Sequence, residues 1–177
     1  MLRQVVLLRG INLGSRNRIA MPALRKALTE AGFEDVQTYL QSGNVVLSSG
    51  AAPATVTRKC KALIAERFGL DIDVVVRTRD ELADVVRRNP LGDVAKDPKR
   101  YQVSFLSAKP GRKVVRRLEE LAVGDERLVA DGRELYAWHP AGVARSKLWA
   151  ALAGRGLGVT ATARNWTTVT KLLDLAE

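Results

Sequence analysis

The chain has 177 residues, of which 46% are hydrophobic and 27% are charged, a composition typical of a globular protein large enough to bury a core. Its net charge of +10 comes from 29 lysines and arginines against 19 acidic residues, with an excess of five cations on each side of Pro90. The sequence has no apolar run of about eighteen residues, so it predicts no membrane helix, and its first apolar run is too short for a signal peptide. A single cysteine, Cys60, excludes an internal disulfide. We therefore expect a cytoplasmic protein.

The first half of the chain predicts two helices among four strands, in the order β-α-β-β-α-β. Apolar and β-branched runs predict the strands at residues 4–8, 36–40, 45–48 and 72–76. One helix begins at Pro22, and another carries an apolar stripe from Val56 to Phe68. Thr78 and Glu81 have the spacing of a capping box, which predicts a further helix ending before Pro90. This order is that of a ferredoxin-like unit with one appended helix.

The second half predicts the same order of elements. Residues 90–100 contain two prolines and few apolar side chains, which indicates a linker. Asp131-Gly132 is a strong hairpin signal between two short strands. We therefore predict an α+β fold of two tandem ferredoxin-like units, each followed by an extra helix, without a residue-level repeat. The predicted division of the chain is 1–89, a linker at 90–100, and 101–177.

Three stretches are similar to a known family. They are Leu8-Arg9-Gly10-Ile11-Asn12-Leu13-Gly14, Gln41-Ser42-Gly43-Asn44-Val45-Val46 and Thr162-Ala163-Arg164-Asn165-Trp166-Thr167-Thr168-Val169. Together with Ser146-Lys147-Leu148, they resemble the bacterial domain-of-unknown-function family numbered 1697. The resemblance implies an α/β protein of two similar ferredoxin-like parts, with no established activity, cofactor or substrate. Leu13 and Gly14-Ser15 depart from the Val and Gly-Gly that members often show, a change that a loop can absorb.

Fold geometry predicts that the first two of these stretches meet. In a ferredoxin-like sheet the first and third strands are antiparallel neighbours, so the end of one lies beside the start of the other. This places residues 9–12 and 42–44 on one edge, which we call the rim. Residues 164–166 follow the last strand and would complete the rim if the corresponding edges of the two halves were adjacent. The candidate ligand-binding residues are therefore Arg9, Gly10, Asn12, Arg16, Arg18, Ser42, Gly43, Asn44, Arg164, Asn165 and Trp166.

Two interpretations of these residues stay open. Guanidinium groups suit phosphate or carboxylate, amides both donate and accept hydrogen bonds, and glycines let a ligand approach the backbone. This set binds an oxyanion but contains no evident proton shuttle. Alternatively, the glycines and asparagines only form turns, and Arg9 or Arg164 holds backbone carbonyls between the halves.

Several kinds of catalytic site are disfavoured. His139, the only histidine, follows a strand and has no partner by motif, so we interpret it as a surface residue. Cys60 lies on an apolar helical stripe, which indicates a core thiol and not a nucleophile. One histidine and one cysteine make a zinc site improbable, and we predict no metal and no cofactor.

The leading hypothesis is a protein that binds a small phosphate- or carboxylate-bearing ligand at the rim, with enzymatic activity left open. The alternatives are a nucleic-acid-binding protein that uses distributed phosphate contacts, and a structural or interaction module without a ligand. Binding of RNA in the manner of an RRM is disfavoured because the strands at residues 4–8 and 45–48 carry no aromatic side chain. Arg112-Lys113 and Arg116-Arg117 on one helix keep phosphate-only binding open.

Overall fold

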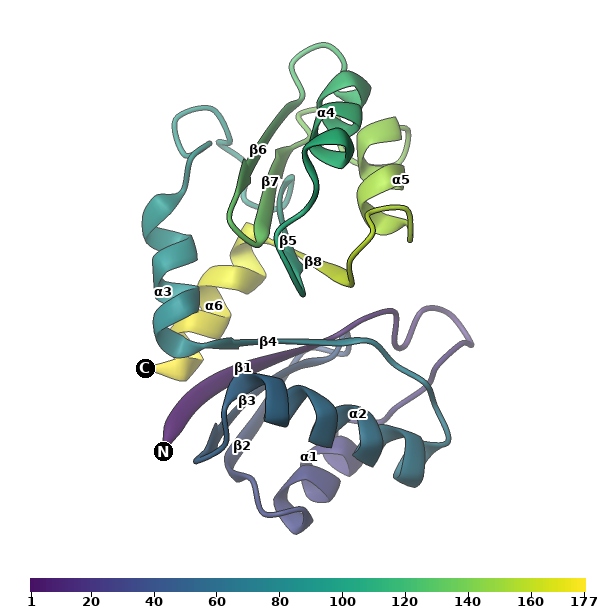
Figure 1. Ribbon diagram of the computed structural model, residues 1–177, viewed down its shortest axis with the longest axis vertical. Helices are drawn as coiled ribbons and strands as arrows, with labels where there is room; N and C mark the ends of the chain where they lie inside the picture. Colours follow the sequence, from purple (N-terminus) through teal and green to yellow (C-terminus); the bar gives the residue numbers. More distant parts are fainter. The chain divides into compact units, whose positions relative to one another are not determined.

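The computed structural model describes residues 1–177, which divide into two compact units, residues 1–84 with 172–177 and residues 85–171. Each unit is built around a four-stranded antiparallel sheet (Figure 1). The predicted α+β fold of two ferredoxin-like units is confirmed. No helix has the length and apolarity needed to cross a membrane.

The sheet of the first unit has the strand order β2-β3-β1-β4, so the first and third strands are central neighbours, as predicted. Its elements are β1 (Leu2–Leu8), α1 (Met21–Glu30), β2 (Glu34–Tyr39), β3 (Asn44–Ser49), α2 (Pro53–Phe68), β4 (Val74–Thr78) and α3 (Arg79–Arg88). The chain passes into the second unit within α3.

The sheet of the second unit has the corresponding order β6-β7-β5-β8. Its elements are β5 (Tyr101–Leu106), α4 (Arg112–Leu121), β6 (Arg127–Asp131), β7 (Glu134–Trp138), α5 (Lys147–Ala153), β8 (Ala161–Asn165) and α6 (Trp166–Ala176). The predicted linker, residues 90–100, forms turns within this unit and contains no helix or strand. The domain boundaries inferred from the sequence stay a prediction.

Each sheet buries one face under two helices. In the first unit α1 and α2 cover the sheet (Figure 1), and alternate strand residues such as Val6, Leu8 and Val76 form the core with Leu24 and Ile64. In the second unit the corresponding core joins Leu106 and Leu135 of the sheet to helix residues. These helix residues are Leu118 of α4 together with Leu148 and Leu152 of α5. The alternation along the strands explains this arrangement, because successive side chains point to opposite faces.

Short polar signals set where the appended helices begin. The hydroxyl of Thr78 accepts a hydrogen bond from the backbone N–H of Glu81 (3.1 Å), and the Glu81 carboxylate accepts one from the N–H of Thr78 (2.8 Å). The predicted capping box is therefore confirmed. In the second unit the side-chain oxygen of Asn165 accepts a bond from the N–H of Thr168 (2.9 Å) at the start of α6. β4 thus continues directly into α3, and β8 continues directly into α6.

Some strand boundaries differ from the prediction. The strand expected at residues 72–76 is β4 at 74–78, and the one expected at 36–40 is β2 at 34–39. Ile72 is almost fully buried but precedes the strand, so its apolar side chain indicates burial and not strand pairing. Burial alone does not determine where backbone pairing starts.

The two units repeat each other at the level of the backbone. The N–H of Leu8 bonds to the carbonyl of Gly43 (2.9 Å) in the first unit, and the N–H of Leu106 bonds to that of Arg133 (2.9 Å) in the second. One residue later, the backbone N–H of Arg9 donates to the carbonyl of Asp73 (2.9 Å), and the N–H of Ser107 donates to the carbonyl of Thr160 (2.8 Å).

The same register relates two buried arginines. Arg77 of β4 pairs with Val5, and Arg164 of β8 pairs with Val103. Each arginine donates to the carbonyl of the residue before it, at 3.1 Å and 2.8 Å. The structural register therefore reveals equivalent positions that the sequence alone does not align.

Candidate functional site

The rim of the first unit brings together residues 9–12 and residues 42–44. Leu7 of β1 pairs with Asn44 of β3, and the backbone bond from Leu8 to Gly43 closes the end of the sheet. The loop after β1 and the turn before β3 are therefore neighbours. The prediction that residues 9–12 lie beside residues 42–44 is confirmed.

Asn12 ties the loop after β1 to this turn. Its amide nitrogen donates to the carbonyls of Ile19 (2.9 Å) and Gln41 (2.7 Å), and its oxygen accepts from the N–H of Ile19 (2.8 Å). Asn17 makes a similar bond to the carbonyl of Gly10 (3.0 Å). Both asparagines adopt positive φ, a region that asparagine tolerates better than most residues. These amides shape the rim, because their polar atoms are engaged by the protein.

The turn before β3 depends on Gly43 and Asn44. Gly43 has φ of +87°, and a Cβ at this position would lie 2.7 Å from the Cβ of Leu8. Asn44 is fully buried and donates to the carbonyl of Tyr39 and the hydroxyl of Ser42, both at 3.0 Å. Glycine is therefore required here by both backbone conformation and space.

A cavity of about 450 Å³ opens at the rim between the loop and the turn. Its lining residues are Asn12, Arg18, Ile19, Ala20 and Gln41. The Arg18 side chain is exposed and donates from one terminal nitrogen to the carbonyl of Gly14 (2.8 Å). Ala20 is the N-cap of α1, which has no side-chain cap and no acidic residue in its first turn. The cavity therefore combines a guanidinium group with the positive end of a helix dipole.

The other predicted cations occupy different environments. Arg16 is exposed in the same loop, where its N–H bonds to the carbonyl of Leu13 (3.1 Å). Arg9 is half-buried at the end of β1. Neither residue lines the cavity.

The third stretch lies in the second unit. Arg164 is buried and donates to the hydroxyl of Thr162 (2.7 Å) and the carbonyl of Ala163 (2.8 Å). Burial lowers its pKa to about 10, which still leaves the guanidinium charged at neutral pH. Asn165 caps α6, and the Trp166 ring stacks on Tyr101 with 4.7 Å between centroids. Each of these side chains therefore has a local structural role within its unit.

Comparison with known proteins places the chain in a family. The model of a family described as a protein of unknown function, DUF1697, matches residues 1–136, which include both rim stretches. The chain belongs to the DUF1697 family. The structure of a conserved bacterial protein from Streptococcus pneumoniae has the same fold, with a TM-score of 0.81, 22% identity and 99% of each chain covered. No curated protein matches the chain.

His139 of this DUF1697 protein is not the surface residue that we predicted. Its side chain is fully buried, and its Nδ1 lies 2.6 Å from Oε2 of Glu126. The hydroxyl of Ser146 donates to the same carboxylate oxygen (2.6 Å) and accepts from the N–H of Trp149 (3.0 Å) as the N-cap of α5. The prediction was wrong because Glu126 and Ser146 stand at no recognisable motif spacing from His139, so the sequence does not reveal the contact.

This cluster borders a cavity of about 770 Å³, which Glu126 and Ser146 help to line. Its geometry differs from a nucleophilic triad, in which one ring nitrogen of the histidine bonds to the carboxylate and the other bonds to the hydroxyl. Here the same ring nitrogen, Nδ1 of His139, faces both Oε2 of Glu126 (2.6 Å) and Oγ of Ser146 (3.3 Å), and Nε2 is buried without a hydrogen bond. The arrangement instead joins the end of β7 to the start of α5 through the Glu126 carboxylate.

Cys60 lies where the sequence predicted it. The thiol is buried in the core under α2, and burial raises its pKa to about 12. A thiol with this pKa is a poor nucleophile at neutral pH because almost none of it is thiolate.

Proposed function

We propose that this protein binds a small anion, bearing a phosphate or carboxylate group, in the cavity at the rim of the first unit. The observation that supports this most is the coincidence of three features in one place: a cavity of about 450 Å³, the exposed guanidinium of Arg18, and the uncapped start of α1. Backbone N–H groups at a helix N-terminus and an arginine fork both favour oxyanions.

The loop is held in shape before any ligand arrives. Asn12 makes two hydrogen bonds to Ile19 within the loop and one to Gln41 of the turn, and Asn17 bonds to Gly10. A ligand that enters a preformed site does not have to order the loop, which lowers the entropic cost of binding. We therefore assign Asn12, Asn17, Gly43 and Asn44 to the frame of the site and Arg18 to the ligand contact.

The proposed site is smaller than the set of candidates from the sequence. Arg164 already bonds to protein oxygens in a buried position, so we leave it, Asn165 and Trp166 out of the site. Arg16 lies in the same loop but does not line the cavity, and it would add a longer-range attraction for anions. The cytoplasmic location inferred from the sequence stays a prediction.

The nucleic-acid alternative has less support. Three of the four aromatic side chains of the second sheet, Tyr101, Phe105 and Tyr136, are each at most 1% exposed, and only Trp138 at the end of β7 is partly exposed. Stacking on exposed strand aromatics is the usual basis of single-stranded RNA recognition by such sheets. This sheet therefore lacks a row of exposed strand aromatics, and a nucleic acid would have to bind mainly by its phosphates.

A thermal-shift panel tests the proposal. Inorganic phosphate, sulfate and acetate are added at constant ionic strength, with chloride as the reference. A ligand present at ten times its Kd adds about 1.4 kcal/mol to the unfolding free energy, which corresponds to a rise in Tm of roughly 3–6 °C for a protein of this size. We expect phosphate or acetate to stabilise the wild-type protein by this amount.

The matched variants are Arg18→Gln and Arg25→Gln, which remove the same charge. Arg25 is exposed on α1 and does not line the cavity. We expect the shift to be clearly smaller in Arg18→Gln than in the wild type and to persist in full in Arg25→Gln. No stabilisation of the wild type by any of these anions, or an equal loss in both variants, would refute the proposal.

A further inference from the structure

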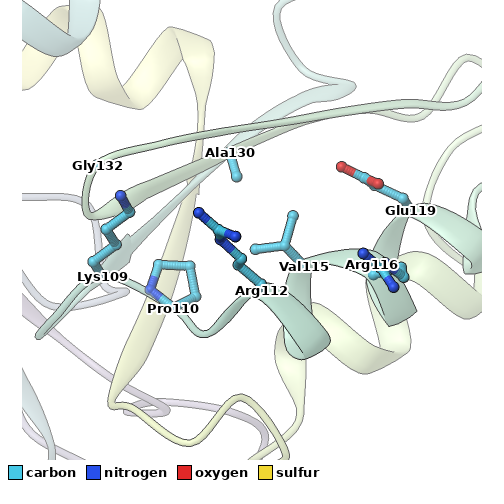
Figure 2. Close-up of a pocket in the computed structure, with 8 residues that line it drawn as sticks. All are labelled: Lys109, Pro110, Arg112, Val115, Arg116, Glu119, Ala130 and Gly132. Carbon is cyan, nitrogen blue, oxygen red and sulfur yellow. The ribbon is translucent and has the colours of Figure 1, made fainter.

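The second unit has its own cavity at the position that corresponds to the rim. It measures about 300 Å³ and lies between the start of α4 and the β6–β7 hairpin (Figure 2). The cations Lys109, Arg112 and Arg116 line it together with the apolar residues Pro110, Val115 and Ala130. Figure 2 shows the Lys109 and Arg112 side chains extending toward the hairpin.

The correspondence follows from the backbone register of the two units. The bond from Leu106 to Arg133 in the second unit takes the place of the bond from Leu8 to Gly43 in the first. In both units, the chain leaves the first strand immediately after this bond and enters the first helix through a loop. Both cavities therefore lie between that loop and the hairpin of the same sheet. The residues that line them differ in type, which is why the sequence shows no repeat here.

The cations in this cavity are not neutralised by the protein. Lys109, Arg112 and Arg116 are exposed, and none has an ion pair or a side-chain hydrogen bond, whereas the neighbouring Arg117 donates to the carbonyl of Gly156 (2.7 Å). Glu119 is the one carboxylate in the lining. Three cations against one acid leave a net positive charge that attracts an anion.

The placement of these cations is unfavourable for the helix alone. Arg112 begins α4, whose first turn has no acidic residue and whose N-cap, Gly111, provides no side-chain cap. Positive side chains at this end oppose the helix dipole, whereas a bound anion is stabilised by it. The arrangement therefore favours an occupied site over an empty one.

We propose that this cavity is a second anion site, which takes a small organic phosphate whose apolar part contacts Pro110, Val115 and Ala130. The lining supports a compact ligand better than a polynucleotide, because Glu119 would repel a chain of phosphates that extended along α4. The proposal goes beyond the rim site, since the two cavities share no residue.

An NMR titration of the full chain with phenyl phosphate tests this site. We expect saturable shifts of the amide signals of residues 111–116 and 130–133, with tighter binding than inorganic phosphate shows because of the apolar lining. Absence of saturable shifts at these amides would overturn the proposal. So would binding of a ten-residue oligothymidylate at these amides at lower concentrations than phenyl phosphate, which would indicate a nucleic-acid surface.

Matched variants separate a built site from a general charge effect. Lys109→Gln/Arg112→Gln should weaken phenyl phosphate binding at least about tenfold, because two charge-assisted contacts are lost. Lys147→Gln/Lys171→Gln removes the same charge from exposed positions of this unit outside the cavity and should leave the affinity unchanged. Equal weakening in both variants would contradict the proposal. Loss of these shifts in Arg18→Gln would contradict the independence of the two sites.

Discussion

Replacing Gly43 by alanine should destabilise the first unit, because two separate costs meet at this residue. Gly43 has φ of +87°, where a residue with a Cβ is strained. The added Cβ would also lie 2.7 Å from the Cβ of Leu8 and 3.0 Å from the side chain of Ile11. The Cβ of Leu8 cannot swing away, because a Cβ moves only with its backbone, whereas the contact with Ile11 is with the end of a side chain that is itself buried in the core.

The expected magnitude is the sum of these two effects. A left-handed conformation costs a non-glycine residue about 1–2 kcal/mol. Forcing an extra methyl group into a packed core costs typically about 1–3 kcal/mol. Gly43→Ala should therefore lower the free energy of unfolding by roughly 2–5 kcal/mol.

A series of glycine variants separates the two effects. Gly10 has φ of +67° with no atom within 4 Å of an added Cβ, so Gly10→Ala should lose only the roughly 1–2 kcal/mol of conformational strain. Gly50 has neither positive φ nor a close neighbour, so Gly50→Ala should stay within about 1 kcal/mol of the wild type. Urea unfolding followed by far-UV circular dichroism measures all three, since every tryptophan lies in the second unit. If Gly43→Ala were no less stable than Gly10→Ala, the close approach of the turn to β1 would be refuted.

The remaining predictions concern the buried titratable groups. Cys60, with its pKa raised to about 12 by burial, should not react with a thiol reagent at pH 8 in the folded protein, and rapid labelling without denaturant would contradict its burial. Burial raises the pKa of Glu126, but hydrogen bonds from Ser146, His139 and the backbone outweigh it and hold the pKa below its ordinary value of 4.5. The stability from Glu126 is therefore present above pH 4.5 and is lost as the pH falls through the lowered pKa of the folded protein. Glu126→Gln should lose roughly 1.5–3 kcal/mol at pH 7 and show a smaller acid dependence in urea unfolding, whereas a loss equal to that of the exposed Glu120→Gln would argue against the cluster.

The order of the elements and the meeting of the first two stretches could be predicted from the sequence. Alternating apolar residues, the capping box at Thr78 and the hairpin signal at Asp131-Gly132 are local patterns, and local patterns determine helices, strands and turns. The ferredoxin-like order then implies that the first and third strands are neighbours, which places Asn12 near Gln41.

The hydrogen-bond partners of the polar side chains could not be predicted in the same way. The cluster of Glu126, His139 and Ser146 depends on side chains from three separate segments, and no spacing reports such a contact. The side-chain amide of Asn12 likewise forms its hydrogen bonds with backbone groups, although an asparagine amide could equally well bind a ligand. Which polar groups are already satisfied is a property of the three-dimensional structure, and it reduces the candidate site to the cavity beside Arg18.

The most direct test of the central proposal is to locate an anion at the rim. Crystals grown without sulfate or phosphate and soaked in selenate would reveal a bound tetrahedral anion by its anomalous signal. We expect a peak in the cavity lined by Asn12, Arg18 and Gln41, within hydrogen-bonding distance of the Arg18 guanidinium. An empty rim in a crystal that holds selenate elsewhere on the protein, with Arg18 exposed to solvent in that lattice, would contradict it.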